Sequence, residues 1–310
     1  SIAVEAQAEG LDPGWLRTLA PALNVLQGVD TVFSADTSLR FDPNGDLQEG
    51  KLALNAGDSL IDLPGILERP ITAYGFSADL SIGAYGAKWQ LEKAEIALAD
   101  NARVTVSGTA NRGANEGLAE LSVHAQNFTV AKVLEAWPIA VSPPARAWIA
   151  ENIHEGRIPE FKASVRANIG ARGQPVAFHD FEVDGRMPLR DVRMSFWGPL
   201  PEATGIDAEA RITERHFEAE VLKGVAGPME INGANVVVTG IDKGKGHEAL
   251  DLTAGLAGPV SGLMTILNER PMGFADFLGL RPAQLRGGIA GTLSLNFPPV
   301  ADLSLDDVQI

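Results

Sequence analysis

The chain has 310 residues, of which 45% are apolar, so it is long enough to bury a sizeable core. Its net charge of −15 and its scattered basic residues exclude the basic face that nucleic-acid binding requires, and the absence of cysteine excludes disulfides, thiolate metal sites and cysteine nucleophiles. The 33 glycines and 19 prolines favour many short strands separated by turns over a bundle of helices.

Alternating strands are predicted along most of the chain. Apolar and polar residues alternate clearly in five stretches, which are residues 51–55, 103–107, 120–124, 206–212 and 289–297. Turn-forming residues cluster at 42–46, 111–113, 171–173 and 242–246. Connections of this length join antiparallel strands, because a parallel crossover needs a dozen residues or more. The sequence therefore predicts an antiparallel meander.

Two short helices are predicted to interrupt this meander between residues 127 and 169. The first ends at Pro138, which cannot continue a helix. The second begins with Ser142 as its N-cap, has prolines 143–144 in its first turn, and has Gly156 as its C-cap. The apolar stripes of the two helices hold Val133, Leu134 and Trp137, then Ala145, Trp148, Ile149 and Ile153.

An internal repeat is also visible. A short leucine-containing helix that ends in proline recurs at residues 15–21, 133–138 and 263–271, and each copy is followed by a glycine and a strand. We interpret the repeats, at about 10–127, 128–257 and 258–310, as stacked copies of one β-unit. No serine-, glycine- or charge-rich linker separates them, so residues 1–310 are predicted to form one continuous segment.

The predicted sheet of roughly ten to fourteen strands has one apolar face, and that face must be covered. It could pack as a two-layer sandwich, or it could curl into a trough whose inside stays apolar and open. The apolar residues are mostly small aliphatic ones, and aromatic residues make up only 6% of the chain. This composition favours a trough for acyl chains over a densely filled core.

Residues that could carry catalysis or bind a metal lack the required spacing. The histidines, which are His124, His154, His179, His216 and His247, form no metal-binding pair. Residues 42–46 imitate the start of a calcium loop, but Leu47 and Ala53 stand where glycine and glutamate are needed. The turn at residues 244–247 lacks the spacing of a phosphate-binding loop. We expect no enzyme, no catalytic residue, no metal and no cofactor.

Several stretches resemble a known family. They are the pattern Leu134-x-x-Trp137-Pro138 with Pro143-x-x-Arg146-x-Trp148-Ile149, the segment from Trp197 to Ala210, the ladder from Leu222 to Val236, and the segment from Gly258 to Gly291. Together they are similar to the DUF3971-containing branch of the AsmA-like superfamily, typified by YhdP and related to TamB. The similarity covers residues 120–300 with good specificity, with one departure at residues 261–262.

This resemblance implies a mainly β fold in which a long antiparallel curled sheet forms an open, β-taco-like apolar groove with short helical inserts. It implies phospholipids as partners, transport of lipid between inner and outer membranes, a periplasmic location, and an inner-membrane anchor outside this piece of a longer chain. Envelope proteins at the ends of the full-length bridge are further implied partners. The groove lining predicted from the alternation consists of Leu52, Leu54, Val104, Val106, Leu121, Val123, Val165, Ile169, Ile206, Ile212, Val221, Leu293 and Leu295.

Two alternatives from other classes stay open. The TamB relationship suggests a scaffold for the assembly of outer-membrane proteins, which would use an exposed strand edge. A carbohydrate-binding sandwich is disfavoured because only two tyrosines are present to form aromatic platforms. Lipid transfer requires a continuous apolar lining, whereas a scaffold requires an accessible edge.

Overall fold

The protein is mainly β in the residues that the computed structural model describes, which are 1–12, 28–62, 67–137, 139, 143–171, 178–195, 201–243, 249–269 and 273–297. All strands in these ranges belong to one hydrogen-bonded sheet that is not closed into a barrel. Strand order along the sheet follows the order along the chain, as hairpin connections require. The predicted mainly β, antiparallel fold with few short helices is confirmed.

The chain divides into two compact units. Unit 1 comprises Ser1–Phe128, Glu135–Ala140 and Glu160–Gly185, and unit 2 comprises Thr129–Leu134, Val141–Pro159 and Arg186–Ile310. Strands β10 (Ile153–Gly170) and β11 (Phe178–Met194) contribute residues to both units. The organisation as one continuous segment with three weak repeats stays a prediction.

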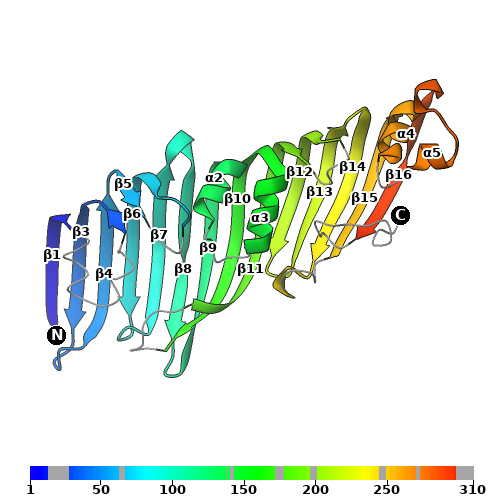
Figure 1. The fold of residues 1–310 in the computed structure, drawn as a ribbon. Coiled ribbons are helices and arrows are strands. Elements are labelled where there is room, and N and C mark those ends of the chain that lie inside the picture. Colours follow the sequence, from blue (N-terminus) through cyan, green and yellow to red (C-terminus); the bar gives the residue numbers. More distant parts are fainter. Residues whose placement is uncertain are drawn as a thin grey trace. The chain divides into compact units, whose positions relative to one another are not determined.

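Unit 1 is built largely from strands that, apart from β2 and β5, lie side by side in chain order (Figure 1). They are β1 (Ile2–Leu11), β2 (Val29–Asp30), β3 (Phe33–Phe41), β4 (Leu47–Ala56), β5 (Ser59–Ile61), β6 (Ile71–Gly83), β7 (Lys88–Leu98), β8 (Arg103–Arg112) and β9 (Glu116–Thr129), with the short helix η2 (Ala99–Asn101) between β7 and β8. The short strands β2 and β5 pair with each other off the main path. The main path of the described sheet therefore has fourteen strands (16 − 2), at the upper end of the predicted number.

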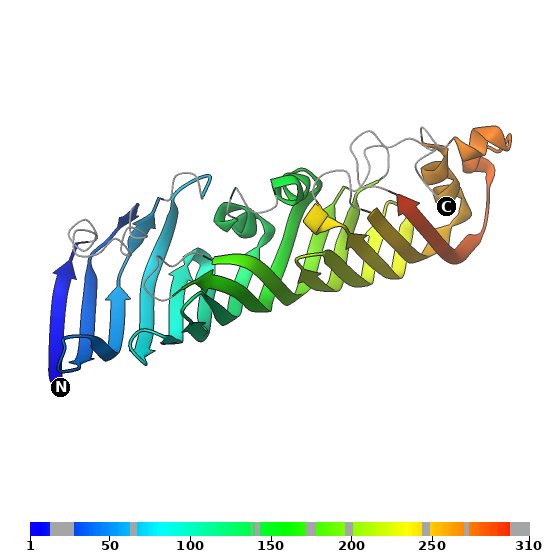
Figure 2. The same ribbon diagram turned by 90° about the horizontal axis from the view of Figure 1, so that it is seen from below.

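Unit 2 combines strands with short helices. Its elements are α3 (Pro143–Asn152), β12 (Ala203–Thr213), β13 (His216–Ala226), β14 (Met229–Thr239), η3 (Ile241–Lys243), β15 (Ala249–Pro259), α4 (Val260–Asn268), α5 (Phe274–Phe277), η4 (Pro282–Gln284) and β16 (Gly288–Phe297). Figure 2 shows α3 and α4 on the same side of this unit's sheet. Neither α3 nor α4 lies on the opposite side of the sheet in this view.

The strand predictions are confirmed in the described residues, whereas the turn predicted at residues 111–113 starts later, because β8 extends to Arg112. All five alternating stretches lie within strands, namely β4, β8, β9, β12 and β16. The turn at residues 42–46 joins β3 to β4, and its backbone N–H groups at Asn44 and Asp46 donate to Asp42 Oδ1 over 2.8 and 3.0 Å. The aspartate side chain thus holds a hairpin turn, as predicted.

Helices are found where the described part of the chain tests them. α2 spans Val130–Ala136 and carries Val133 and Leu134, and Trp137 follows directly. α4 occupies the position of the third predicted helix. Outside the described residues lie the helix predicted at 15–21, Pro138, Ser142, Trp197, Pro271, and the second halves of the turns at 171–173 and 242–246.

The predicted end of the second helix is wrong. α3 ends at Asn152, and Gly156 lies inside β10 and not at a helix C-cap. The Asn152 side-chain amide donates to the Trp148 carbonyl over 2.8 Å, so a side chain caps the last turn. Because an extended strand begins directly at Ile153, the chain needs no left-handed glycine to leave the helix.

Candidate functional site

One face of unit 1 is apolar across seven strands. Residues that lie directly opposite each other in antiparallel strands project from the same face, so the strand register assigns each side chain to a face. Three parallel rows cross β1, β3, β4, β6, β7, β8 and β9 in that order. The small-residue row holds Ala8, Ala35, Leu54, Ala78, Ala94, Val106 and Val123; the leucine row holds Ala6, Thr37, Leu52, Leu80, Leu91, Gly108 and Leu121; the aromatic row holds Leu11, Phe33, Ala56, Phe76, Ile96, Val104 and Ala125.

These three rows form a surface and not a closed core. Phe33 is 4% exposed, Ala6 is exposed, and every other member of the rows is half-buried. None of the members is charged, and the hydroxyl of Thr37 donates to the Lys51 carbonyl over 3.0 Å. The apolar face of unit 1 therefore presents accessible hydrocarbon. The Thr37 hydroxyl, the one hydroxyl in these rows, has its hydrogen-bond acceptor within the sheet.

The structure brings six of the predicted lining residues together on this face. Leu52 and Leu121 lie in the leucine row, Val104 lies in the aromatic row, and Leu54, Val106 and Val123 lie in the small-residue row. Two further predicted residues lie in β10, where Val165 is half-buried and Ile169 is only 2% exposed. Ile169 is therefore packed against protein atoms and presents no open surface.

The predicted lining residues of unit 2 lie in a more tightly packed environment. Ile206 and Val221 are 7% and 9% exposed and belong to a buried cluster with Val192 and Ala254. Ile212 and Leu293 are half-buried, and Leu295 pairs with Leu252 in the backbone register. Unit 2 thus uses its apolar face largely as core, whereas unit 1 leaves its apolar face partly open.

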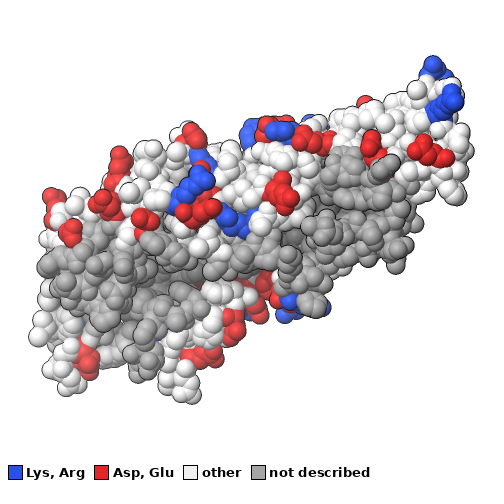
Figure 3. Space-filling view, viewed as in Figure 1, with Lys and Arg blue, Asp and Glu red and all other residues white. Residues whose placement is uncertain are grey.

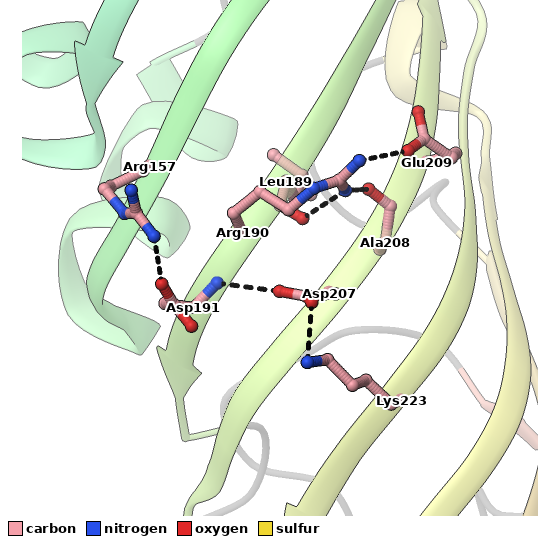
Figure 4. A network of polar contacts seen from close by, with 8 residues as sticks. All are labelled: Arg157, Leu189, Arg190, Asp191, Asp207, Ala208, Glu209 and Lys223. Atoms are coloured by element: carbon pink, nitrogen blue, oxygen red, sulfur yellow. Dashed lines mark hydrogen bonds and ion pairs between the residues drawn. The ribbon is translucent and has the colours of Figure 1, made fainter.

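The opposite face of unit 2 carries a ladder of charged groups across β10 to β13 (Figure 4). Arg157 pairs with Asp191, whose backbone N–H donates to Asp207 Oδ1 over 3.1 Å. Lys223 Nζ lies 3.0 Å from Asp207 Oδ2, and Arg190 Nη2 lies 2.6 Å from Glu209 Oε1. The Asp191 N–H and, after it, the Lys223 ammonium hold the pKa of Asp207 below its ordinary value.

Charged pairs also cross the polar face of unit 1. The Lys93 ammonium lies 2.6 Å from Glu95 and the Arg103 guanidinium 3.1 Å from it, and the hydrogen bond from Lys93 lowers the pKa of Glu95. Glu160 accepts hydrogen bonds from Lys162 and His124, which lower its pKa in that order. On the face displayed in Figure 3, the described side chains form no broad basic surface.

A shallow hollow of about 700 Å³ lies on the polar side of unit 1. The hollow is lined by four apolar residues, which are Ala6, Leu52, Ala53 and Leu80, and by nine polar ones, which are Glu5, Gln7, Asp36, Thr37, Ser38, Lys51, Asp79, Ser81 and Glu92. Four carboxylates against one ammonium do not suit hydrocarbon, because a charged group in contact with an acyl chain loses its hydration without compensation. The apolar face, and not this hollow, is the candidate site for an apolar ligand.

Sequence reasoning missed a buried cation at the end of the apolar face. Arg112 is 8% exposed, and its guanidinium donates to the carbonyls of Gly170 over 3.0 Å and of Ala171 over 2.6 Å. It also lies 5.6 Å from the centre of the Trp89 ring, and the Trp89 indole N–H donates to the Gly86 carbonyl. The partners of Arg112 are 58 and 59 residues away in the chain, so no local pattern could reveal them.

The described histidines contact neighbouring polar groups. His124 lies 2.8 Å from Glu160, His154 lies 2.8 Å from the Ser195 hydroxyl, His179 lies 3.3 Å from Glu116, and His216 lies 3.1 Å from the Thr213 hydroxyl, while His247 lies outside the described residues. In the described ranges, no three or more histidine, cysteine or acidic side chains gather closely enough to hold a metal ion. The absence of a metal or catalytic site stays a prediction.

A family model for the YhdP protein matches residues 37–301, which is most of the chain. The chain belongs to the YhdP family. The resemblance to AsmA-like proteins of the YhdP type is thereby confirmed, and it places the chain among envelope proteins, while the relationship to TamB stays a prediction. No curated protein and no solved structure gives a significant match. None of the helices in the described ranges is long and apolar enough to span a membrane.

Proposed function

We propose that this chain is a periplasmic segment of an AsmA-like bridge protein that holds phospholipid acyl chains on its apolar sheet face and supports lipid transport between the inner and outer membranes. The observation that carries the proposal is the apolar face of unit 1, where three rows cross seven strands without a charged residue. Membership of the YhdP family supports the envelope setting.

The proposed mechanism is passive partition. Each methylene group that moves from water onto apolar surface gains about 0.8 kcal/mol, so an acyl chain needs no specific polar contact to bind. Headgroups stay in water, and no bond is made or broken. A continuous apolar face allows a chain to move along it, because no row member presents a charge that would have to be desolvated.

A scaffold for outer-membrane protein assembly is the second candidate. A strand with one open edge can accept a strand from another chain. This candidate requires an accessible edge and tolerates a lipid-free apolar face.

The first test is lipid analysis of the purified chain before and after a charge is placed on the apolar face. Val106 lies between Ala94 and Val123 in the small-residue row, so Val106→Asp places a carboxylate where an acyl chain would lie. We expect co-purified phospholipid, measured by mass spectrometry of organic extracts, to fall at least tenfold, because the desolvation of a carboxylate exceeds the roughly 1.4 kcal/mol that corresponds to a tenfold change.

The matched control is Ser107→Asp. Ser107 is the next residue on β8, pairs with Ser122, and projects from the polar face. The lipid content of the Ser107→Asp variant should equal that of the wild type. A folded wild-type chain that carries no lipid, or equal lipid in both variants, would contradict the proposal and favour the scaffold.

A further inference from the structure

The short helix α5 and the residues that follow it form an exposed apolar element in unit 2. Phe277 and Leu278 are 86% and 57% exposed, and Phe274 and Leu280 are exposed as well. We call these four residues the α5 tip. Figures 1 and 2 show α5 farther from β12 than α4 is, at the end of this unit. Apolar side chains that gather on one exposed element mark a contact site, whereas those exposed singly need no explanation.

Hydrogen bonds hold the α5 tip in its exposed position. The Leu280 N–H donates to the Ala275 carbonyl over 2.8 Å. The Gly279 N–H donates to the Asp276 carbonyl over 3.1 Å, and Gly279 has the positive φ, +66°, that this way of ending a helix requires. Ala275 is fully buried, and the Asn268 side chain at the end of α4 accepts the Asp276 N–H over 2.9 Å. α5 is therefore anchored on its buried side, and the α5 tip faces solvent.

Two arginines follow the α5 tip and give this region a charge opposite to that of the chain. Residues 273–289 contain Arg281, Arg286 and Asp276, a net charge of +1 (2 − 1), whereas the whole chain carries −15. Both arginines are exposed, and with the described residues neither forms an ion pair. The Arg286 guanidinium donates to the Ala283 carbonyl over 3.1 Å. Figure 3 shows basic side chains at this end of unit 2, where their remaining donors can reach an anionic group from outside.

We propose that the α5 tip docks unit 2 on the surface of a phospholipid bilayer. Phe277 and Leu278 insert at the boundary between headgroups and acyl chains, where amphipathic protein elements bury their apolar side. Arg281 and Arg286 donate hydrogen bonds to headgroup phosphates, whose geometry matches the guanidinium group. This docking role is separate from the proposed binding of acyl chains, because the α5 tip belongs to unit 2 and the apolar face belongs to unit 1.

Shape and charge favour a bilayer over a protein partner. A side chain that is 86% exposed, as Phe277 is, projects from a convex surface, so a protein partner would need a pocket to receive it, whereas a fluid bilayer needs none. A zwitterionic bilayer presents phosphates to Arg281 and Arg286 without the negative surface potential that would repel a chain of charge −15. The partner is therefore a zwitterionic phospholipid surface.

The first test is co-sedimentation of the chain with vesicles of phosphatidylcholine. The double variant Phe277→Ser/Leu278→Ser removes the inserted side chains, so its binding to vesicles should weaken about tenfold or more. Arg281→Gln/Arg286→Gln should weaken binding several-fold, because the contacts with phosphate are lost. All four residues are exposed, so the melting temperatures of both variants should equal that of the wild type.

The matched control is Leu222→Ser/Val225→Ser. Leu222 and Val225 are 50% and 42% exposed on β13 of the same unit, so this variant also loses exposed apolar area, but away from the α5 tip. Binding of the control to vesicles should equal that of the wild type. An equal loss in both double variants would assign binding to general adhesion of apolar surface and overturn the docking role. A wild type that ignores vesicles but dimerises through the α5 tip would also overturn it.

A label on the α5 tip measures insertion directly. The chain contains no cysteine, so Leu278→Cys carries a single environment-sensitive fluorophore. We expect phosphatidylcholine vesicles to shift its emission to shorter wavelength and to raise its intensity, because the fluorophore leaves water. The same fluorophore on Leu222→Cys should not respond. Unchanged emission of the Leu278→Cys label on addition of vesicles would overturn insertion.

The two assays separate docking from the proposed lipid function. The Phe277→Ser/Leu278→Ser variant should keep the co-purified phospholipid of the wild type, because neither residue lies on the apolar face of unit 1. If the wild type carries phospholipid but does not bind vesicles, the docking role is wrong and the lipid function stands. If the wild type carries no phospholipid but binds vesicles through the α5 tip, the docking role stands and the lipid function is wrong.

Discussion

At the scale of single residues, a few positions decide whether neighbouring strands can approach. Gly108 in β8 has φ of +153°, and a Cβ added there would lie 2.2 Å from the Glu120 carbonyl oxygen and 2.8 Å from the Leu121 Cα. Both are backbone atoms of the adjacent strand, so neither can turn aside as a flexible side chain would. The leucine row therefore needs glycine at this one position.

Gly108→Ala should lower the free energy of unfolding by about 2–3 kcal/mol, since the β8–β9 pair must open to admit the methyl group. The measurement is the midpoint of urea unfolding. Gly83→Ala is the control, because Gly83 lies in β6 of the same unit and a Cβ there meets no atom within 4 Å. A Gly108→Ala variant as stable as Gly83→Ala would show that the two strands are less closely paired than described.

At the scale of strands, the polar face of unit 2 is organised by charge pairs between neighbours. Asp207 connects β11, β12 and β13, because it accepts the Asp191 N–H on one side and the Lys223 ammonium on the other. Its side chain is 18% exposed, which is less than any other charged group in this ladder. Removal of the Asp207 charge should therefore lower stability more than removal of the charge of Arg157 or Lys223.

The pKa of Asp207 is lowered from its ordinary value of 3.8, so its contribution to stability is present above that pH and is lost as the pH falls through the folded-state value. Asp207→Asn should have a lower melting temperature than the wild type at pH 6. The difference should shrink towards zero as the pH falls below about 4. Melting curves between pH 2 and 7 measure it, and a difference that does not change with pH would contradict this role.

The positions of the strands were predictable from the sequence because alternation is a local signal. The burial of the strand side chains was not predictable in this way. Alternation within β4, β8 and β9 placed Leu52, Val106 and Leu121 on one face, and the register confirms that they share it. The same alternation cannot distinguish an open face from a packed one, so Ile169 has the pattern of a lining residue and is only 2% exposed. The depth of a side chain depends on residues from other strands, such as Gly117 of β9, which leaves room for the Ile169 side chain.

The predictions of a C-cap at Gly156 and of a turn at Arg112 were wrong for a related reason. Gly156 is a reasonable helix C-cap if only its neighbours in the sequence are considered, but the pairing of β10 begins before it. Arg112 looked like part of a polar turn, although its partners lie after the end of β10. Tertiary contacts overrode local preference in both places.

At the scale of the whole molecule, the proposed binding of acyl chains to a partly open apolar face implies that stability depends on the ligand. A ligand that binds only the folded chain adds RT ln(1 + [L]/Kd) to its stability, or about 2.7 kcal/mol at a hundredfold excess over Kd. The net charge of −15 keeps such a molecule dispersed in water despite its open apolar surface.

We expect the melting temperature of delipidated chain to rise with added short-chain phosphatidylcholine below its micelle concentration, and the rise to grow with the logarithm of concentration. Differential scanning fluorimetry with intrinsic tryptophan emission measures it. The Val106→Asp variant should show no rise. An equal rise in both chains would assign the effect to detergency and not to binding on the apolar face.

The contacts of Arg112 affect the order in which parts of the chain become fixed during synthesis. Its two carbonyl partners are made 58 and 59 residues after it, so at a synthesis rate of about 5–20 residues per second several seconds pass before they exist. Until then the β8–β9 hairpin lacks the hydrogen bonds from Arg112, and the apolar face of the preceding strands is exposed. We expect the β8–β9 hairpin to stay loosely fixed during synthesis until residue 171 has been made, because the Arg112 guanidinium gains its two carbonyl partners only then.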